Sequence, residues 1–272
     1  MEQKAILITG ASSGIGLATA LQLMEKGFRV YAASRHGGEY QKAKTSNGEI
    51  VPVKMDVNNE EDIKKVIEQI LNENQSLYAV ISNAGNGIAG AVEDTSIEEA
   101  KYQFETNFFG AFKVIKACLP IFRQQEQGKI IATSSVAAIV PIPFQSFYSA
   151  SKAALLLLMQ GLYMEVKSFG IECCTILPGD TKTNFTFARK YTAASQSPAS
   201  AYAEKMKKAV GKMEKDEQNG MSAEAIARAI VKEITKKHMK AVVIPGFQYK
   251  VICWLFNRLP VKFRLWVVGL LY

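Results

Sequence analysis

Residues 5–16 read AILITGASSGIG, an apolar run of strand length that passes directly into a glycine-rich turn. A helical period of apolar residues follows at 15–26, so the turn joins a strand to a helix. Glycines let such a turn close tightly and let backbone N–H groups approach a pyrophosphate, whose charge the helix N-terminus favours. The residues expected to hold it are Gly10, Ser12, Ser13, Gly14, Ile15 and Gly16.

Apolar segments of strand length alternate with longer amphipathic segments along most of the chain. Strands are predicted at 5–9, 28–34, 49–53, 77–82, 129–134, 171–177 and 241–244, and helices at 15–26, 60–71, 97–124 (one or two), 146–169 and 222–237. Such alternation predicts an α/β fold, a single Rossmann-type doubly wound parallel sheet with helices on both faces. No linker-like stretch divides the chain, so we expect one domain over 1–245, a substrate-lid insertion at about 181–221, and a tail at 246–272.

The composition excludes several other classes of protein. With 48% hydrophobic and 21% charged residues among 272, the chain can build a sizeable core and is not expected to be disordered. The two histidines lie far apart and the four cysteines form no CxxC pair, so no metal site is expected. Adjacent Cys173 and Cys174 lie in an apolar run, and no signal peptide is apparent, which together favour a reducing, cytoplasmic setting.

The spacing TGxxxGxG at residues 9–16 resembles the short-chain dehydrogenase/reductase family, and the resemblance extends over residues 4 to about 245. The stretch PGDTKTNF at 178–185 is similar to the 17β-hydroxysteroid dehydrogenase-like and retinol dehydrogenase-like branch. This resemblance implies an oxidoreductase that uses a nicotinamide dinucleotide and acts on CH–OH groups.

The end of the second predicted strand bears on the choice between NAD and NADP. It reads Ala33-Ser34-Arg35 and lacks the carboxylate that usually accepts from the ribose 2′-OH of NAD. Arg35 offers a planar, permanent cation that suits a 2′-phosphate, and in the family Ser34 stands where NAD-preferring members carry Asp. We therefore expect NADP(H) to be preferred over NAD(H), the alternative being that Arg35 is a surface arginine. The nearby cations that could reinforce it, or be plain solvated charge, are His36, Lys42 and Lys44.

Other cofactor contacts are implied by the resemblance. Asp56 and Val57 would contact the adenine, and Asn83, Ala84 and Gly85 match a motif that stabilises the sheet and approaches the ribose. The segment after the sixth strand would contact the nicotinamide carboxamide. Its expected contacts are Pro178, Gly179, Thr181 and Thr183.

Tyr148 and Lys152 are four residues apart in a predicted helix, so their side chains share one face. A tyrosine pKa near 10 is too high for base catalysis at neutral pH, and a nearby ammonium would lower it. The family places its catalytic serine at the position of Ser135, where it orients the substrate oxygen. The resemblance also gives Tyr148 and Lys152 contacts with the cofactor and assigns Asn107 to a water that relays protons from Lys152.

The substrate is expected to be lipophilic. The loop after the fifth strand carries Ile139, Val140, Ile142, Phe144 and Phe147, and the insertion carries Phe185, Phe187, Tyr191, Tyr202, Met206 and Met213. About half of these are expected to pack against neighbours, and the rest suit a steroid- or retinoid-like ketone. A 3-ketoacyl or 3-ketosphingoid reductase is the alternative enzyme, and a non-catalytic dinucleotide-binding regulator is the alternative of another class.

The excess charge lies entirely in the last quarter of the chain. Residues 1–200 carry 19 basic and 19 acidic groups, whereas 201–272 carry 14 and 6, and no acid follows Glu233. Residues 251–272 read VICWLFNRLPVKFRLWVVGLLY, too interrupted by charge and by Pro260 to span a bilayer. We expect this tail either to pack over the pocket or a dimer partner, or to lie peripherally on a membrane surface. Nucleic acid is not an expected partner, and the family implies a homodimer or homotetramer.

Overall fold

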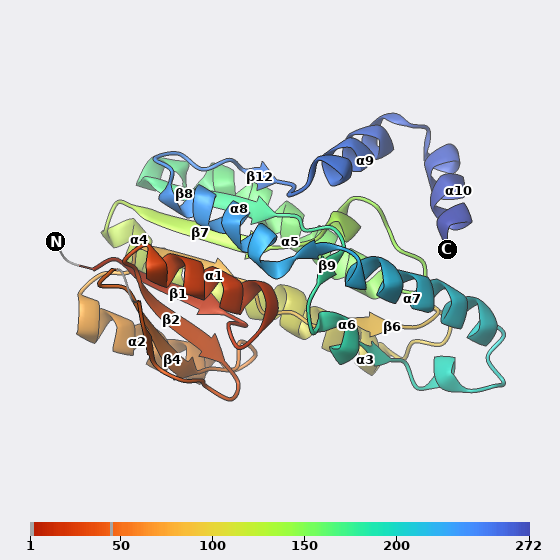
Figure 1. The fold of residues 1–272 in the computed structure, drawn as a ribbon, viewed down its shortest axis with the longest axis horizontal. Helices are drawn as coiled ribbons and strands as arrows, with labels where there is room; N and C mark the ends of the chain where they lie inside the picture. Colours follow the sequence, from red (N-terminus) through yellow and green to blue (C-terminus); the bar gives the residue numbers. More distant parts are fainter. Residues whose placement is uncertain (1–2, 44–45) are drawn as a thin grey trace.

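A central sheet organises the chain, in a computed structural model that describes residues 3–43 and 46–272. Its strand order is β12-β8-β7-β5-β1-β2-β4-β3 (Figure 1). The parallel strands are β1 (Ala5–Thr9), β2 (Arg29–Ser34), β4 (Glu49–Lys54), β5 (Ala79–Ser82), β7 (Gly128–Thr133), β8 (Ile171–Ile176) and β12 (Val242–Val243). A short strand, β3 (Gln41–Lys42), adds an antiparallel edge that the sequence did not predict.

Helices cover both faces of the sheet, which confirms the predicted doubly wound fold. Helices α1 (Gly14–Glu25) and α8 (Ala223–Thr235) pack on one face, and α2 (Glu60–Asn74), α4 (Ala111–Gln124) and α5 (Ser146–Glu165) pack on the other. Strand β8 shows why its sequence is apolar throughout. Its neighbours Cys173 and Cys174 enter the two different cores, because successive side chains of a strand point to opposite faces.

Helix α8 begins at a polar cap that its sequence supplies. Ser222 accepts a hydrogen bond from the backbone N–H of Ala225 at 3.2 Å and so occupies the N-cap position. The region predicted as one or two helices divides into α3 (Ile97–Phe104), a π-helix η1 (Glu105–Gly110) and α4. A single π-helical turn inside an α-helix frequently marks a functional position.

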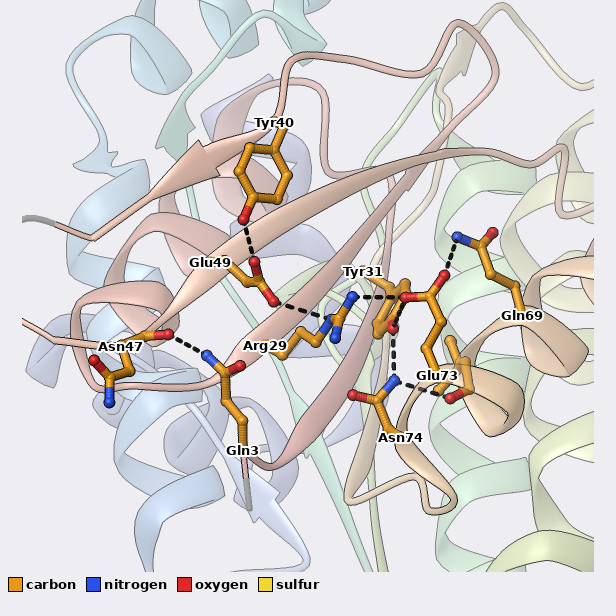
Figure 2. Close-up of polar contacts among 10 residues, drawn as sticks. Gln3, Arg29, Tyr31, Tyr40, Asn47, Glu49, Gln69, Glu73 and Asn74 are labelled. Carbon is orange, nitrogen blue, oxygen red and sulfur yellow. Dashed lines mark hydrogen bonds and ion pairs between the residues drawn. The ribbon is translucent and has the colours of Figure 1, made fainter. Parts of the chain in front are cut away.

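A polar network fixes the edge of the sheet that lies away from the glycine-rich turn (Figure 2). Glu73 of α2 accepts hydrogen bonds from Arg29 and from the Tyr31 hydroxyl, both at 2.7 Å, and from Gln69 at 2.9 Å. Asn74 donates to the same hydroxyl, and burial raises the pKa of Tyr31 to about 12. The network therefore ties α2 to β2 and keeps Tyr31 protonated.

The insertion is more ordered than its composition suggested. Its elements are β9 (Thr181–Lys182), α6 (Phe185–Ala188), β10 (Lys190–Tyr191), α7 (Ala203–Gln218) and β11 (Met221–Ser222). Strand β9 pairs with β11, and β10 pairs with β6 (Ile88–Ala89), so both ends of the insertion are anchored. Met206 and Met213 of α7 are buried in a small separate core.

The tail forms two helices, α9 (Phe247–Arg258) and α10 (Val261–Leu271), with Pro260 at the bend between them (Figure 1). Across residues 3–43 and 46–272, no helix has both the length and the apolar content needed to cross a membrane. All four cysteines are buried free thiols, on α4 (Cys118), β8 (Cys173 and Cys174) and α9 (Cys253).

Candidate active site

A cavity of about 700 Å³ lies at the carboxyl ends of the central strands. Here the strand order reverses, with β2 and β4 on one side of β1 and β5, β7 and β8 on the other. Ligands of open parallel sheets bind at this switch point. The predicted site residues that line the cavity are Gly10, Ser12, Ser13, Gly14, Ile15, Ser34, Arg35, Asp56, Val57, Asn83, Ala84, Gly85, Ser135, Tyr148, Lys152, Pro178, Gly179, Thr181 and Thr183. Gly16 and Asn107 are not among the lining residues.

The glycine-rich turn permits a close approach to its backbone. Gly10 and Gly14 have positive φ angles of 66° and 54°, a region that favours glycine. Gly16 packs inside the turn, where an added Cβ would lie 2.2 Å from the carbonyl oxygen of Gly10. Asn83 donates to the carbonyl oxygens of Thr9 and Gly10, at 3.2 and 3.3 Å, and so ties the turn to β5. Because α1 begins at Gly14, the turn and the helix N-terminus together fit a pyrophosphate.

The far end of the cavity carries one exposed cation. Arg35 lines it and, among the described residues, has no ion-pair partner, whereas Ser34 is buried and donates to the carbonyl oxygen of Gly37 at 2.6 Å. Asp56 accepts from the backbone N–H of Asn58 at 2.9 Å, which shapes the loop after β4. Neither His36 nor Lys42 lines the cavity, and Lys44 lies outside the described residues. This end therefore fits a 2′-phosphate through Arg35.

The three residues expected to perform the chemistry meet at the centre of the cavity. Ser135 follows β7 and accepts from the backbone N–H of Ala137 at 3.1 Å. It also forms a side-chain hydrogen bond with Tyr148 of α5. Lys152 lies one turn further along α5 and donates from Nζ to the carbonyl oxygen of Thr133 at 2.9 Å. The neighbouring Ser134 instead donates to the backbone of Lys152 at 2.8 Å, which gives it a structural contact.

Burial away from water has the largest effect on the pKa values of Tyr148 and Lys152. Burial raises the pKa of Tyr148 to about 12, although its hydrogen bond with Ser135 lowers it. Burial lowers the pKa of Lys152 to about 8, because the ammonium is almost fully enclosed. The Lys152 Nζ atom lies 5.9 Å from the centre of the Tyr148 ring, so the two groups are neighbours in the cavity. Burial is thus the largest influence on the pKa of Tyr148, and the lowering of that pKa by Lys152 stays a prediction.

Asn107 lies behind the cavity wall, on the π-helix η1. Its Oδ1 accepts from the backbone N–H of Asn86 at 2.8 Å, and its Nδ2 donates to the Asn86 carbonyl at 3.0 Å and to Ser151 at 3.2 Å. Gly85 separates it from the cavity, because an added Cβ there would lie 3.2 Å from Asn107 Oδ1 and 3.4 Å from Lys152 Nζ. Asn107 and Lys152 are thus neighbours, as the resemblance implied.

Sequence reasoning missed two residues that hold this network. Gln103 is fully buried, accepts from the backbone N–H of Ile88 at 2.7 Å, and donates to both the carbonyl and the side-chain oxygen of Asn86. Asn86 comes directly after the Asn83–Gly85 motif, and this position could have indicated that Asn86 lies near the site. Gln103 gave no clue, because its partners are 15 to 17 residues away in the chain.

The loop after β8 closes the cavity over the glycine-rich turn. Thr181 donates to the carbonyl oxygen of Gly179 at 2.8 Å, and Thr183 lies so close to Gly14 that a Cβ there would be 3.3 Å from its methyl group. The ring of Phe185 lies 5.6 Å from that of Tyr148, centre to centre. This loop thus reaches from the expected pyrophosphate site to the expected acid.

The other end of the cavity combines apolar side chains with charged ones from the insertion, among them Lys190, Lys212, Asp216 and Glu217. Val140 and Ile142 of the predicted wall line it, whereas Ile139, Phe144 and Phe147 do not. Phe144 instead packs on the small core of α7, and Phe187 is 76% exposed. Five residues of the tail also line the cavity, although the sequence did not decide whether the tail packs over the pocket or lies on a membrane surface. They are Tyr249, Ile252, Val268, Leu271 and Tyr272.

A buried ion pair holds the insertion beside this end of the cavity. Arg189, at the end of α6, contacts Glu217 of α7 and lies 3.8 Å from Glu214. Thr186 donates to Glu217 at 2.6 Å. Burial raises the pKa of Glu217, although the Arg189 charge lowers it. Because Glu217 lines the cavity, the pair also shapes the wall close to Tyr148.

Comparison with known proteins agrees with this geometry. A family model described as short chain dehydrogenase matches residues 4–194. The chain is 38% identical to 3-ketodihydrosphingosine reductase of Bacteroides thetaiotaomicron, over 92% of this chain and 88% of that protein. It is 33% identical to human retinol dehydrogenase 8, over 67% of this chain and 60% of that protein.

Solved structures show the same fold. A short chain dehydrogenase/reductase from Burkholderia phymatum in complex with NAD has a TM-score of 0.77 at 20% identity, covering 94% of this chain and 92% of its own. A short chain dehydrogenase from Burkholderia cenocepacia in complex with NADP has a TM-score of 0.71 at 22% identity, covering 94% of each chain. The fold itself accepts either dinucleotide. With its sheet, its cavity and its sequence relatives in agreement, the chain belongs to the short-chain dehydrogenase/reductase family of oxidoreductases.

Proposed function

We propose that the protein is an NADP(H)-dependent oxidoreductase that interconverts a lipophilic secondary alcohol and its ketone. The observation that carries this proposal is the meeting of Ser135, Tyr148 and Lys152 in a cavity to which the loop after β7 and the tail contribute apolar side chains. A pure cofactor sensor would not need this complete set of groups.

Each residue has a distinct role in the proposed reaction. Ser135 donates to the substrate oxygen and holds it toward Tyr148, which gives up its phenolic proton as the alkoxide develops. The dinucleotide supplies the hydride. Lys152 holds the ribose and lowers the pKa of Tyr148 once the site is filled, and Asn107 positions a water that returns protons to Lys152. Burial keeps Tyr148 protonated at neutral pH, which suits an acid and hence the reductive direction.

NADP(H) is proposed over NAD(H) because Arg35 is unpaired among the described residues and lines the cavity where no carboxylate follows β2. The remaining contacts proposed for the dinucleotide are those of the glycine-rich turn, the loops after β4 and β5, and the loop after β8. They follow the family motifs at residues 10–16, 56–57, 83–85 and 178–183.

The substrate proposed first is steroid- or retinoid-like, as the retinol dehydrogenase relative suggests. A 3-ketosphingoid ketone is the second candidate, and the name of the Bacteroides relative favours it. Both are long and lipophilic, which suits the cavity end lined by Val140, Ile142 and the tail. We also propose a cytoplasmic protein with peripheral membrane contact through 251–272, and a homodimer or homotetramer.

The deciding experiment follows the loss of NADPH absorbance with steroid ketones, retinal, 3-ketoacyl thioesters and 3-ketodihydrosphingosine. We expect Tyr148→Phe to slow turnover by about 10²- to 10⁴-fold while NADPH binding, measured by fluorescence, stays within a few-fold. Tyr163→Phe, on the exposed side of α5, is the matched control and should turn over normally. Turnover that survives in Tyr148→Phe would refute the proposed acid. NADPH binding without turnover of any ketone would favour the regulator instead.

A further inference from the structure

The tail presents an unusually large exposed apolar surface, which we call the tail face. On α9 its members recur at helical spacing, while the buried Tyr249, Cys253 and Phe256 form the opposite stripe. On α10 most apolar side chains are exposed, and Val268 is the buried exception. The tail face consists of Phe247, Val251, Trp254, Leu255, Val261, Phe263, Leu265, Trp266 and Leu270, exposed by 37% to 82%. So many exposed apolar side chains on one short segment mark a contact with something else.

The charge on the tail selects among the candidates for that contact. Lys250, Arg258 and Lys262 are exposed, and residues 234–272 contain no Asp or Glu. The Arg258 guanidinium lies 4.2 Å from the centre of the Trp254 ring, and tryptophan beside arginine is typical of the zone between lipid headgroups and acyl chains. A second copy of the same face would oppose like charges, whereas an anionic bilayer is complementary in both charge and polarity.

The tail helices that carry this surface also reach the rim of the cavity. Ile252 of α9 and Leu271 of α10 line the cavity, yet they are 44% and 52% exposed, so they stand at its rim. The remaining tail residues of the lining, including Val268 and Tyr249, are buried deeper. Helices α9 and α10 therefore contribute some side chains to the cavity and expose other apolar side chains, which are free to contact lipid.

We propose that the tail face docks on an anionic phospholipid bilayer, so that the cavity opens onto the lipid and a membrane-dissolved ketone reaches Tyr148 past Ile252 and Leu271 without crossing water. The inference rests on the proposed reductase function and adds a route to it. Transfer of a long lipophilic ketone through water would otherwise carry a free-energy cost that grows with each exposed CH₂ group.

Docking is tested by flotation of the full chain with vesicles, a measurement that needs no turnover. We expect binding to vesicles of phosphatidylcholine with about 30 mol% phosphatidylglycerol, and at least tenfold weaker binding to phosphatidylcholine alone. Trp254→Ser with Trp266→Ser, and separately Lys250→Glu, Arg258→Glu and Lys262→Glu together, should each weaken binding about tenfold or more. Lys26→Glu, Lys64→Glu and Lys65→Glu, on α1 and α2, make the matched charge control and should bind like the wild type.

The route is tested by comparing a vesicle-held long-chain ketone with a water-soluble short-chain ketone. We expect the double tryptophan variant to reduce the soluble ketone within about twofold of wild type but the vesicle-held ketone at least fivefold more slowly. Equal losses on both ketones, or no wild-type binding to anionic vesicles, would overturn the proposal. Light scattering that shows a wild-type dimer and a monomeric tryptophan variant would assign the face to a second copy. Failure to reduce even the soluble ketone would count against the reductase, not against docking.

Discussion

Arg35 is the residue that separates the two dinucleotides in the proposed site. It lines the cavity directly after β2 and pairs with no described carboxylate, so a 2′-phosphate would meet an unengaged guanidinium. Charge-assisted hydrogen bonds are worth about 1.5–3 kcal/mol, so Arg35→Ala should lower kcat/KM with NADPH by about 10- to 100-fold. With NADH it should change little. The control Lys42→Ala removes an exposed cation that does not line the cavity, and a similar loss there would contradict the role of Arg35.

Lys152 gives a pH signature that is independent of turnover. Its pKa is about 8 when folded and about 10.5 when unfolded, because burial disfavours the ammonium. Between these values the unfolded chain binds more protons, so this residue makes the free energy of unfolding rise with pH in that window. Relative to Lys152→Met, the wild type should gain about 2 kcal/mol from pH 7 to 9.5 in urea unfolding. Titration of the buried thiols affects both proteins equally and cancels in the comparison. A difference in the free energy of unfolding that does not change with pH would contradict the lowered pKa of Lys152.

At the scale of elements, the insertion depends on the ion pair between α6 and α7. The Arg189 side chain is fully buried and that of Glu217 is 16% exposed, so removal of one partner leaves the other charge poorly compensated. Arg189→Met should destabilise the protein by about 3–5 kcal/mol, and the double variant Arg189→Met with Glu217→Met by less. Thermal unfolding measures both. Lys113→Met breaks the more exposed pair with Glu105 and should cost about 1 kcal/mol or less; an equal cost at both sites would contradict the argument.

The elements also show how far sequence reasoning reaches. Strands such as β1 and β8 were predictable, because they are short apolar runs between turn residues, and these runs are buried on both faces. Helix α7 was not predicted, although its apolar residues Met206, Val210 and Met213 recur at helical spacing. Its sequence is mostly charged, and this composition favoured a lid over a regular helix. Most of the motif residues line the cavity, although Gly16 and Asn107 do not. Gln103 could not be found, because its partners come from other segments of the chain.

For the whole molecule, Tyr249 makes one of the contacts that join the tail to the domain, beside the packing of Tyr272 on the small core of α7. Tyr249 covers Gly179 so closely that a Cβ on that glycine would lie 2.2 Å from the ring, and its hydroxyl donates to Asp180 at 3.0 Å. Tyr249→Ala should loosen α9 and raise the KM for lipophilic ketones by about tenfold, while the KM for NADPH stays within about twofold. Limited proteolysis should then cut near Gly246. Tyr163→Ala, on α5, is the control, and unchanged proteolysis of Tyr249→Ala would show that the tail is held elsewhere.

The four buried thiols can report on partial unfolding of the molecule, because each becomes reactive only when the layer around it opens. Burial raises the pKa of Cys118, Cys173 and Cys174 to about 12 and raises that of Cys253, so none reacts readily while the fold is closed. Cys118 and Cys173 lie in one core, Cys174 in the other, and Cys253 in α9. The order in which a thiol reagent modifies them therefore maps which layer separates first. Selective labelling of Cys253 would register the lifting of the tail alone, in the unmodified chain.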